Sequence, residues 1–316
     1  MVPEASFTSY YGRPVINAPV WRSPEVPGYL FLGGLAGTSS LLAAGAALTG
    51  RPGLRRGAAL GAASAIGLSG VALVADLGRP ERFANMLRVF KVTSPMSVGS
   101  WLLTAYGPAA GLAALADVAG ILPRTRRAAT LTAGALGPAI ATYTAVLLAD
   151  TAVPAWHEGH RELPFVFAGS AATAGAGLGL LVAARPENAP ARRLALAGTI
   201  CELVAANVMV HRLGLLAAPY RNGRAGRLMR QGEAFTLVGL AGSLLAGRSR
   251  TLGVLAGAAL LGASACTRFG IFEAGMASAR DPRDTVVPQR ERLERRGLGD
   301  RAVASGTGAP GSDGAR

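Results

Sequence analysis

FVFAGSAATAGAGLGLLVAA, residues 165–184, is a run of twenty residues without a single charge. A helix needs about 20 mostly apolar residues to cross the hydrocarbon core of a bilayer. Similar runs fill most of the chain, and every gap between them contains arginine or proline. The sequence therefore predicts an all-α, polytopic membrane protein of about eight transmembrane helices, which can divide into two four-helix bundles. The expected spans are 28–48, 57–77, 96–122, 128–149, 165–184, 194–216, 233–247 and 251–275.

The composition supports a membrane location. Half of the 316 residues are hydrophobic and 16% are charged, whereas roughly a quarter are charged in an ordinary soluble domain. The 43 glycines and the low aromatic content of 6% suit helices that approach each other closely. The net charge is +14, but the arginines lie in short clusters between apolar runs and no aromatic-basic RNA motif is present. We therefore expect contact with membrane lipid and no nucleic-acid partner.

The chain is expected to have three parts. These are a polar N-terminal segment at 1–27, an eight-helix transmembrane domain at 28–275, and a basic, largely disordered tail at 276–316. An even number of spans puts both termini on one side, here called the terminal side, where the longer loops also lie. Six arginines follow the last span closely, and this favours a cytoplasmic terminal side in the cell membrane of a prokaryote. The seventh span, 233–247, is short for a crossing, and three explanations remain open: it tilts little, it sits inside the bundle, or it extends into the preceding segment.

Polar residues cluster after the second span. Asp76 and Arg79 are three residues apart and are expected to pair on the helix. The stretch RFANMLRVFK, 82–91, has four apolar residues on one helical face and therefore predicts an amphipathic helix at the membrane interface. Charged residues at a membrane span indicate either function or a structural pairing, and both remain open for Asp76 and Arg79.

The fourth span contains a tyrosine and ends in an aspartate. Tyr143 and Asp150 are seven residues apart, which puts them on nearly the same face and about 10 Å apart along the helix axis. A phenol at this depth can donate a hydrogen bond to a quinone carbonyl. The alternative is a tyrosine of the interfacial aromatic belt.

The sixth span contains Glu202, Asn207 and His211. Asn207 and His211 share a face, whereas Glu202 and His211, nine residues apart, point in opposite directions, so we do not expect one site. An acid near mid-membrane is costly. Glu202 is therefore interpreted either as part of a proton path, together with Asp76 and His211, or as the partner of Arg268 in the last span.

Several kinds of chemistry are not expected of this chain. A bis-histidine haem needs two axial imidazoles within the bundle, but His157 and His160 lie in a loop and only His211 lies in a span. No Walker loop, catalytic triad or metal-ligand cluster is apparent, so neither haem nor a metal in this chain is expected. The sequence therefore favours a subunit that supplies no chemistry beyond binding and proton transfer.

Three stretches resemble the NrfD/polysulphide reductase family of membrane subunits. They are DLGRPERFANMLRVFKVTSPMSVGSW at 76–101, YTAVLLADTAVPAW at 143–156 and LPFVFAGSAATAGAG at 163–177. The resemblance implies eight helices, bound menaquinone or ubiquinone, no haem, and a docked iron–sulfur subunit that connects to a molybdopterin oxidoreductase subunit. Ala145 departs from the Tyr-Thr-Gly expected there, and the first span lacks a histidine.

By this resemblance Tyr143 is the quinone-contacting tyrosine, and Asp76 with Arg79 lies at the edge that faces the iron–sulfur partner. We expect Trp101 and Asp150 to complete the quinone site. The leading hypothesis is a quinone- or quinol-binding membrane anchor that exchanges electrons with the iron–sulfur subunit. The rivals are a secondary transporter or proton-conducting subunit that uses Glu202 and His211, and a purely structural anchor.

Overall fold

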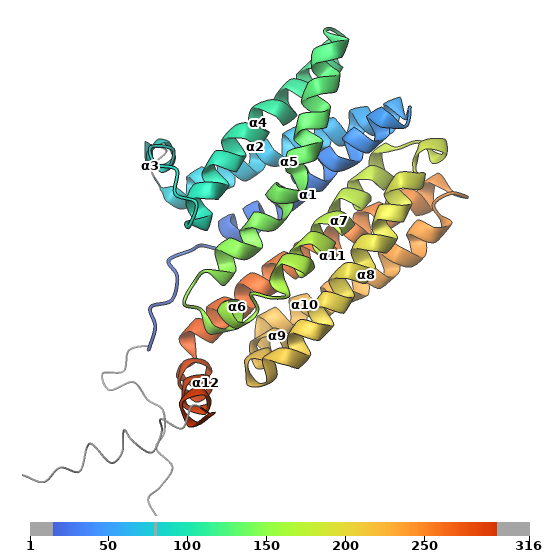
Figure 1. The fold of residues 1–316 in the computed structure, drawn as a ribbon. Helices are drawn as coiled ribbons and strands as arrows, with labels where there is room; N and C mark the ends of the chain where they lie inside the picture. The colour runs from blue at the N-terminus through green and yellow to red at the C-terminus, as the bar shows by residue number, and fades with distance from the viewer. Residues whose placement is uncertain (1–14, 79–80, 296–316) are drawn as a thin grey trace, which may run out of the picture.

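The structure is a computed structural model that describes residues 15–78 and 81–295 (Figure 1). Within this part of the chain eight long helices follow one another, and short helical turns connect them on the terminal side. The long helices are α1 (Glu25–Leu48), α2 (Pro52–Leu77), α4 (Pro95–Ala119), α5 (Pro123–Ala149), α7 (Leu163–Val182), α8 (Ala189–Leu213), α10 (Gly223–Leu245) and α11 (Arg250–Arg280). The shorter elements are α3 (Glu81–Met86), α6 (Pro154–Glu158), η1 (Arg185–Glu187), η2 (Gly214–Ala217), α9 (Ala218–Arg221) and α12 (Pro282–Arg295).

Seven of the described helices are long and apolar enough to cross a membrane. The eighth long helix, α10, is the one predicted to be short. It extends back to Gly223 and has 23 residues, so of the three explanations left open, extension into the preceding segment is the one that the structure shows. Its first turns carry Arg224, Arg227, Arg230 and Glu233, which make this helix more polar than the others. The all-α polytopic fold is therefore confirmed, with α10 as its most polar long helix.

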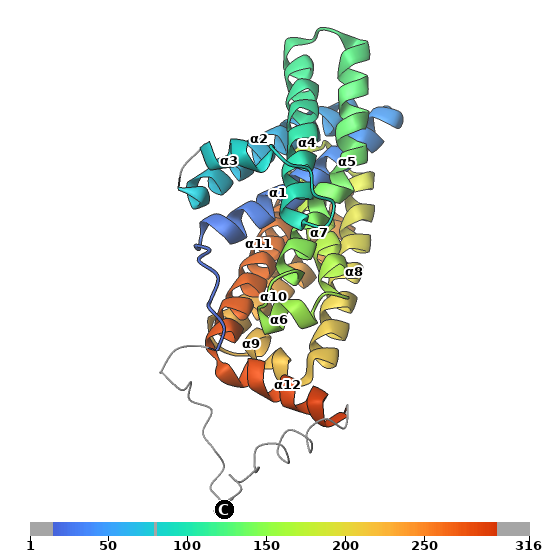
Figure 2. The same ribbon diagram turned by 60° about the vertical axis from the view of Figure 1, so that its left-hand side comes forward.

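The long helices form two sets of four (Figures 1 and 2). In the first set, α1 packs on α2 and α5, while α4 packs on α5 and α2. In the second set, α7 packs on α8 and α11, and α10 packs closely on α11. The two sets meet mainly where α7 contacts α1 and α5. This arrangement matches the expected division into two four-helix bundles.

Small residues allow the helices to cross at short range. At the contact between α1 and α5, a Cβ atom on either Gly37 or Gly137 would collide with the backbone carbonyl of the other glycine. The contact between α7 and α11 is built in the same way from Gly177 and Gly257. Close backbone approach through small residues is the usual way in which membrane helices gain packing contacts, because lipid gives them little hydrophobic driving force to associate.

Side chains cap the helix ends at the tight turns opposite the terminal side. The carboxylate of Glu187 accepts a hydrogen bond of 2.7 Å from the backbone N–H of Leu54, in the first turn of α2. Arg250 donates to the carbonyls of Leu180 and Ala183 at the end of α7, at 2.7 Å each, and Arg192 donates to the carbonyl of Ser243 in α10 at 2.9 Å. A cation at a helix C-terminus satisfies free carbonyls and interacts favourably with the helix dipole. Arginines in the turns thus have a structural role.

An ion pair fixes α7 against α8 on the terminal side. Arg212, in the last turn of α8, donates two hydrogen bonds of 2.6 Å to the carboxylate of Glu162, which immediately precedes α7. The hydrogen bond from Arg212 lowers the pKa of Glu162 below its ordinary value. The two-point geometry is the strong form of an arginine–carboxylate pair.

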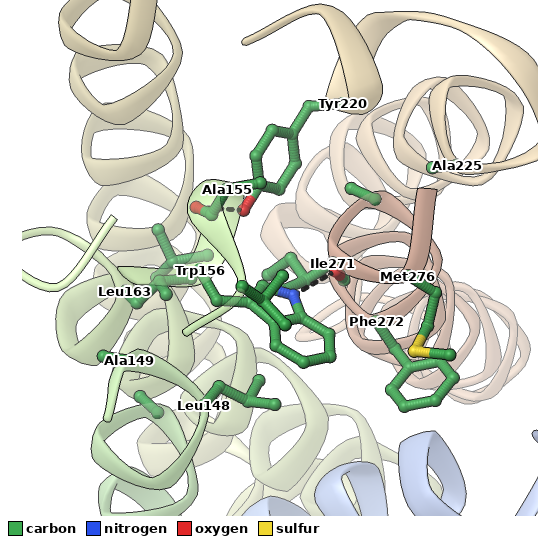
Figure 3. Close-up of a cluster of buried hydrophobic side chains, with 14 of the residues drawn as sticks. Leu148, Ala149, Ala155, Trp156, Leu163, Tyr220, Ala225, Ile271, Phe272 and Met276 are labelled. Carbon is green, nitrogen blue, oxygen red and sulfur yellow. Dashed lines mark hydrogen bonds between the residues drawn. The ribbon is translucent and has the colours of Figure 1, made fainter. Parts of the chain in front are cut away.

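The largest buried cluster lies on the terminal side and is centred on Trp156 of α6 (Figure 3). The indole N–H donates a hydrogen bond of 2.8 Å to the carbonyl of Ile271 in α11. Its ring stacks on Trp21 with centroids 5.6 Å apart and packs on Phe272 at 5.9 Å. The connection between α5 and α7 is therefore held inside the bundle, where it contacts both the N-terminal segment and α11.

Two expectations at the borders of the bundle are wrong. The amphipathic helix predicted for 82–91 ends at Met86. Phe90 lies beyond it and packs edge to face on Trp101, with centroids 6.1 Å apart, so tertiary contact overrides the helical periodicity. The boundary at 275 is also not a helix end, because α11 continues to Arg280 and α12 occupies 282–295. Residues 296–316 of the expected disordered tail lie outside the described residues.

Candidate functional site

A small cavity lies between α1, α2, α4 and α5 at the terminal side. Its volume is about 90 Å³, and we call it the tyrosine cavity. The expected site residues Tyr143 and Asp76 both line it. They come from the ends of α5 and α2 that lie on the terminal side. The order of the helices along the chain predicts this, because successive spans cross the membrane in opposite directions. Further lining residues are Trp21, Tyr29, Met86, Met96, Gly99 and Ser100.

Tyr29 is the residue that sequence reasoning missed. It lies at the start of α1, is 6% exposed and lines the tyrosine cavity together with Tyr143. Hydropathy reasoning counts a tyrosine as one more apolar residue of the span. One signal would have identified Tyr29. It lies one turn inside the first span, at the same membrane level as the polar ends of α2 and α5.

The phenol groups of the tyrosine cavity differ from the other described tyrosines. Tyr106 pairs with the hydroxyl of Ser40 at 2.7 Å, and Tyr220 donates to the carbonyl of Ala155 at 3.1 Å. For Tyr29 and Tyr143, no hydrogen-bond partner is found in the part of the chain that the structure describes. Buried hydroxyls normally have a partner. Two phenol groups thus keep their hydrogen-bonding capacity at one cavity.

Glycine positions the ring of Tyr143. A Cβ atom at Gly99 of α4 would come within 2.5 Å of Cε2 and 2.8 Å of Cδ2 of the Tyr143 ring. Any other residue at position 99 would therefore push this ring away. The carboxylate of Asp76 accepts a hydrogen bond of 3.3 Å from the backbone N–H of Arg22, which links the N-terminal segment to the cavity.

Two of the other expected quinone-site residues, Trp101 and Asp150, do not line the tyrosine cavity. Trp101 is two residues after Gly99 on α4, hence on nearly the opposite face, and is 41% exposed. Asp150 follows the last residue of α5 and lines a different recess, together with residues of α6 and α12. Arg79 lies outside the described residues, so its expected pairing with Asp76 stays a prediction.

A larger cavity of about 400 Å³ lies between α8, α9, α10 and α11, and we call it the glutamate cavity. Glu202 and His211 both line it, although they were not expected to form one site. The cavity follows residues 202, 206 and 210 along α8. Residues four apart are rotated by about 40° around the helix axis. A groove that follows such a row is therefore inclined to the axis, and it reaches the face of His211 within a few turns. The helical wheel alone missed this inclination.

Glu202 is the deepest acid of the glutamate cavity. It is 3% exposed, and one carboxylate oxygen accepts a hydrogen bond of 2.7 Å from Thr267. Its other oxygen, Oε2, has no partner among the described residues. Arg268 does not form the expected ion pair with Glu202. Its guanidinium instead lies over the ring of Phe167, 3.8 Å from the centroid, and donates to the carbonyl of Phe167 at 2.7 Å.

Metal ligands do not gather at either cavity. Within residues 15–78 and 81–295, no group of three histidine, cysteine, aspartate or glutamate side chains is placed to hold a metal ion. Both cysteines are free thiols, at positions 201 and 266. Both cavities offer hydrogen-bonding groups and a carboxyl group, which is Asp76 in the tyrosine cavity and Glu202 in the glutamate cavity.

Comparison with known proteins connects this arrangement to a family. The family model described as "Polysulphide reductase, NrfD" matches residues 16–277, which include all eight long helices almost completely. Among curated proteins, no significant match to the chain was found. The family match covers most of the chain, so the protein belongs to the NrfD family of membrane subunits of polysulphide and related reductases.

Proposed function

We propose that this chain is the quinone- or quinol-binding membrane anchor of a multi-subunit oxidoreductase. It passes electrons between the quinone pool, menaquinone or ubiquinone, and an iron–sulfur subunit that connects to a molybdopterin catalytic subunit. The observation that carries the proposal is that Tyr29 and Tyr143, whose hydroxyls have no hydrogen-bond partner among the described residues, line one cavity together with Asp76. Membership of the NrfD family supports it.

The residues of the tyrosine cavity suit a quinone headgroup. A phenol hydroxyl of Tyr143 or Tyr29 donates a hydrogen bond to a quinone carbonyl, and the Asp76 carboxylate exchanges the protons that accompany quinone reduction or quinol oxidation. The cavity, at about 90 Å³, is smaller than typical ligand pockets of about 300–1,000 Å³. Met86 and Met96 line it, and their flexible side chains can rearrange around a flat ring.

Purification in mild detergent, followed by quinone extraction and identification of bound subunits, tests this proposal. We expect a quinone and an iron–sulfur protein to be recovered with the chain. The partner is expected at the terminal side, which we assign to the cytoplasm. Recovery of the chain alone, without quinone or iron–sulfur protein, in conditions that preserve other membrane complexes would contradict the proposal.

A second candidate function is proton conduction, and the glutamate cavity favours it. The cavity reaches from His211, near the terminal end of α8, to the buried carboxylate of Glu202. Arg230 and Glu233 of α10 also line it, so polar groups stand beside the apolar residues of the cavity. A buried acid at the end of a groove that contains polar groups is suited to accept protons from the terminal side.

Glu202→Gln tests proton conduction. The amide retains the size of the side chain and accepts the hydrogen bond from Thr267, but it does not carry a proton. We expect quinone-linked proton uptake from the terminal side, measured in proteoliposomes with a pH-sensitive dye, to fall by about tenfold or more. Glu273→Gln is the control, because Glu273 pairs with Arg224 at 3.5 Å and does not line the glutamate cavity. Equal proton uptake in wild type and Glu202→Gln would exclude this path.

A further inference from the structure

A recess on the terminal side lies between the α5–α6 connection, α6, η2 and α12. Its volume is about 290 Å³, and we call it the acidic notch. Both views show α12 beyond the ends of the long helices, at the same end of the molecule as α6 (Figures 1 and 2). The charged side chains that line the acidic notch are Asp150, Glu158, Asp284 and Arg292.

The charges of the acidic notch do not balance. Arg292 pairs with Glu158 at 3.0 Å, which leaves the carboxylates of Asp150 and Asp284. His157 also lines the notch, with its ring Nδ1 3.1 Å from the carbonyl of Ala149. The whole chain carries a net charge of +14, so the notch is a local acidic spot on a basic protein.

Asp284 is the strongest indication of a ligand. Its residue is 6% exposed, and its carboxyl group interacts with the hydroxyl of Ser278. The second oxygen, Oδ2, has no partner among the described residues. Burial raises the pKa of Asp284, and the nearby charge of Asp281 raises it further. An unpaired buried carboxylate is unfavourable, and a donor that enters the notch would satisfy it.

The geometry favours an organic cation. The described residues place no three metal-ligating side chains together. A guanidinium or ammonium group, in contrast, needs only carboxylate acceptors at the end of an open recess. Asp150 is exposed and Asp284 is buried, and both carboxylates line the same recess. Elements outside the long helices form the notch, at the end of the molecule that a peripheral protein can reach.

We propose that the acidic notch receives one lysine or arginine side chain of the peripheral subunit that docks on the terminal side. This inference rests on the proposed function, because it requires such a subunit. Opposite charges at a protein interface fix orientation and suppress wrong pairings. A charged side chain seated in this recess gives the partner one defined register.

The double substitution Asp150→Asn/Asp284→Asn tests the inference in the assembled complex. Both changes preserve size and remove charge. Complexes purified in mild detergent are washed with increasing NaCl, and the peripheral iron–sulfur subunit that stays bound is quantified. We expect the affinity of the variant for this subunit to fall by about tenfold or more, with release at lower salt than in wild type. Glu187→Gln is the control, because Glu187 lies at a turn opposite the terminal side and glutamine still accepts the hydrogen bond from the backbone N–H of Leu54.

The outcomes separate this inference from the proposed function. If wild type and the double variant retain the subunit equally at every salt concentration, the acidic notch is not the docking contact, while the proposed function stands. If wild type itself binds no iron–sulfur subunit, both are overturned. Size-exclusion profiles of the variant establish that it is folded. The single substitution Asp284→Asn is a second test of subunit retention, because loss of the buried charge is expected to account for most of the effect of the double substitution.

Discussion

Tyr143→Phe is expected to lower quinone-linked turnover of the assembled complex by about ten- to a hundredfold. The substitution removes one hydroxyl from the tyrosine cavity and leaves the ring against Gly99. Loss of the hydrogen-bond donor to a quinone carbonyl in a buried site costs about 1–3 kcal/mol. This free energy corresponds to the expected change in rate. Steady-state oxidation or reduction of a soluble quinone analogue by the purified complex measures the effect.

Tyr106→Phe provides the matched control for Tyr143. Tyr106 is another buried tyrosine of the first four-helix set, but its hydroxyl already pairs with Ser40 and it does not line the tyrosine cavity. We expect a small loss of stability and unchanged turnover. Tyr29→Phe is expected to lower turnover as Tyr143→Phe does. Unchanged turnover in both cavity variants would remove the phenols from the quinone site.

Trp156→Ala is expected to produce the largest loss of stability, about 3–5 kcal/mol. The side chain is fully buried, its N–H is bonded to Ile271, and its ring packs on Trp21 and Phe272. Alanine would lose this hydrogen bond and leave a cavity, because Gly275, which lies directly against the indole, has no side chain to fill the space.

Thermal unfolding in detergent measures the effect of Trp156→Ala. A thiol-reactive dye is suitable because the free cysteines Cys201 and Cys266, both only partly exposed, become fully accessible on unfolding. Trp101→Ala is the control, since Trp101 is 41% exposed and its loss is expected to shift the unfolding temperature little. Similar shifts for the two tryptophans would show that the Trp156 cluster does not hold the terminal side together.

The sequence predicted the helices because apolar length is a direct consequence of the bilayer. It also predicted that Asp76 and Tyr143 lie at the same end of the bundle, since this follows from counting helices. It did not predict the full set of residues that line each cavity. Trp101 lies on the wrong face of α4, and Glu202 and His211 meet one groove because that groove is inclined to the axis of α8. Such contacts depend on helix rotation and crossing angle, which hydropathy does not encode.

Photolabelling with an azido-quinone tests the central claim most directly. The purified complex is labelled, and the modified peptides are mapped by mass spectrometry with and without excess unlabelled quinone. The account predicts labelling of the α4 and α5 peptides that carry Met96 and Tyr143, protected by unlabelled quinone and reduced in Tyr143→Phe. Labelling confined to the α8 and α10 peptides around Glu202 and Glu233 would contradict it, because the quinone would then occupy the glutamate cavity.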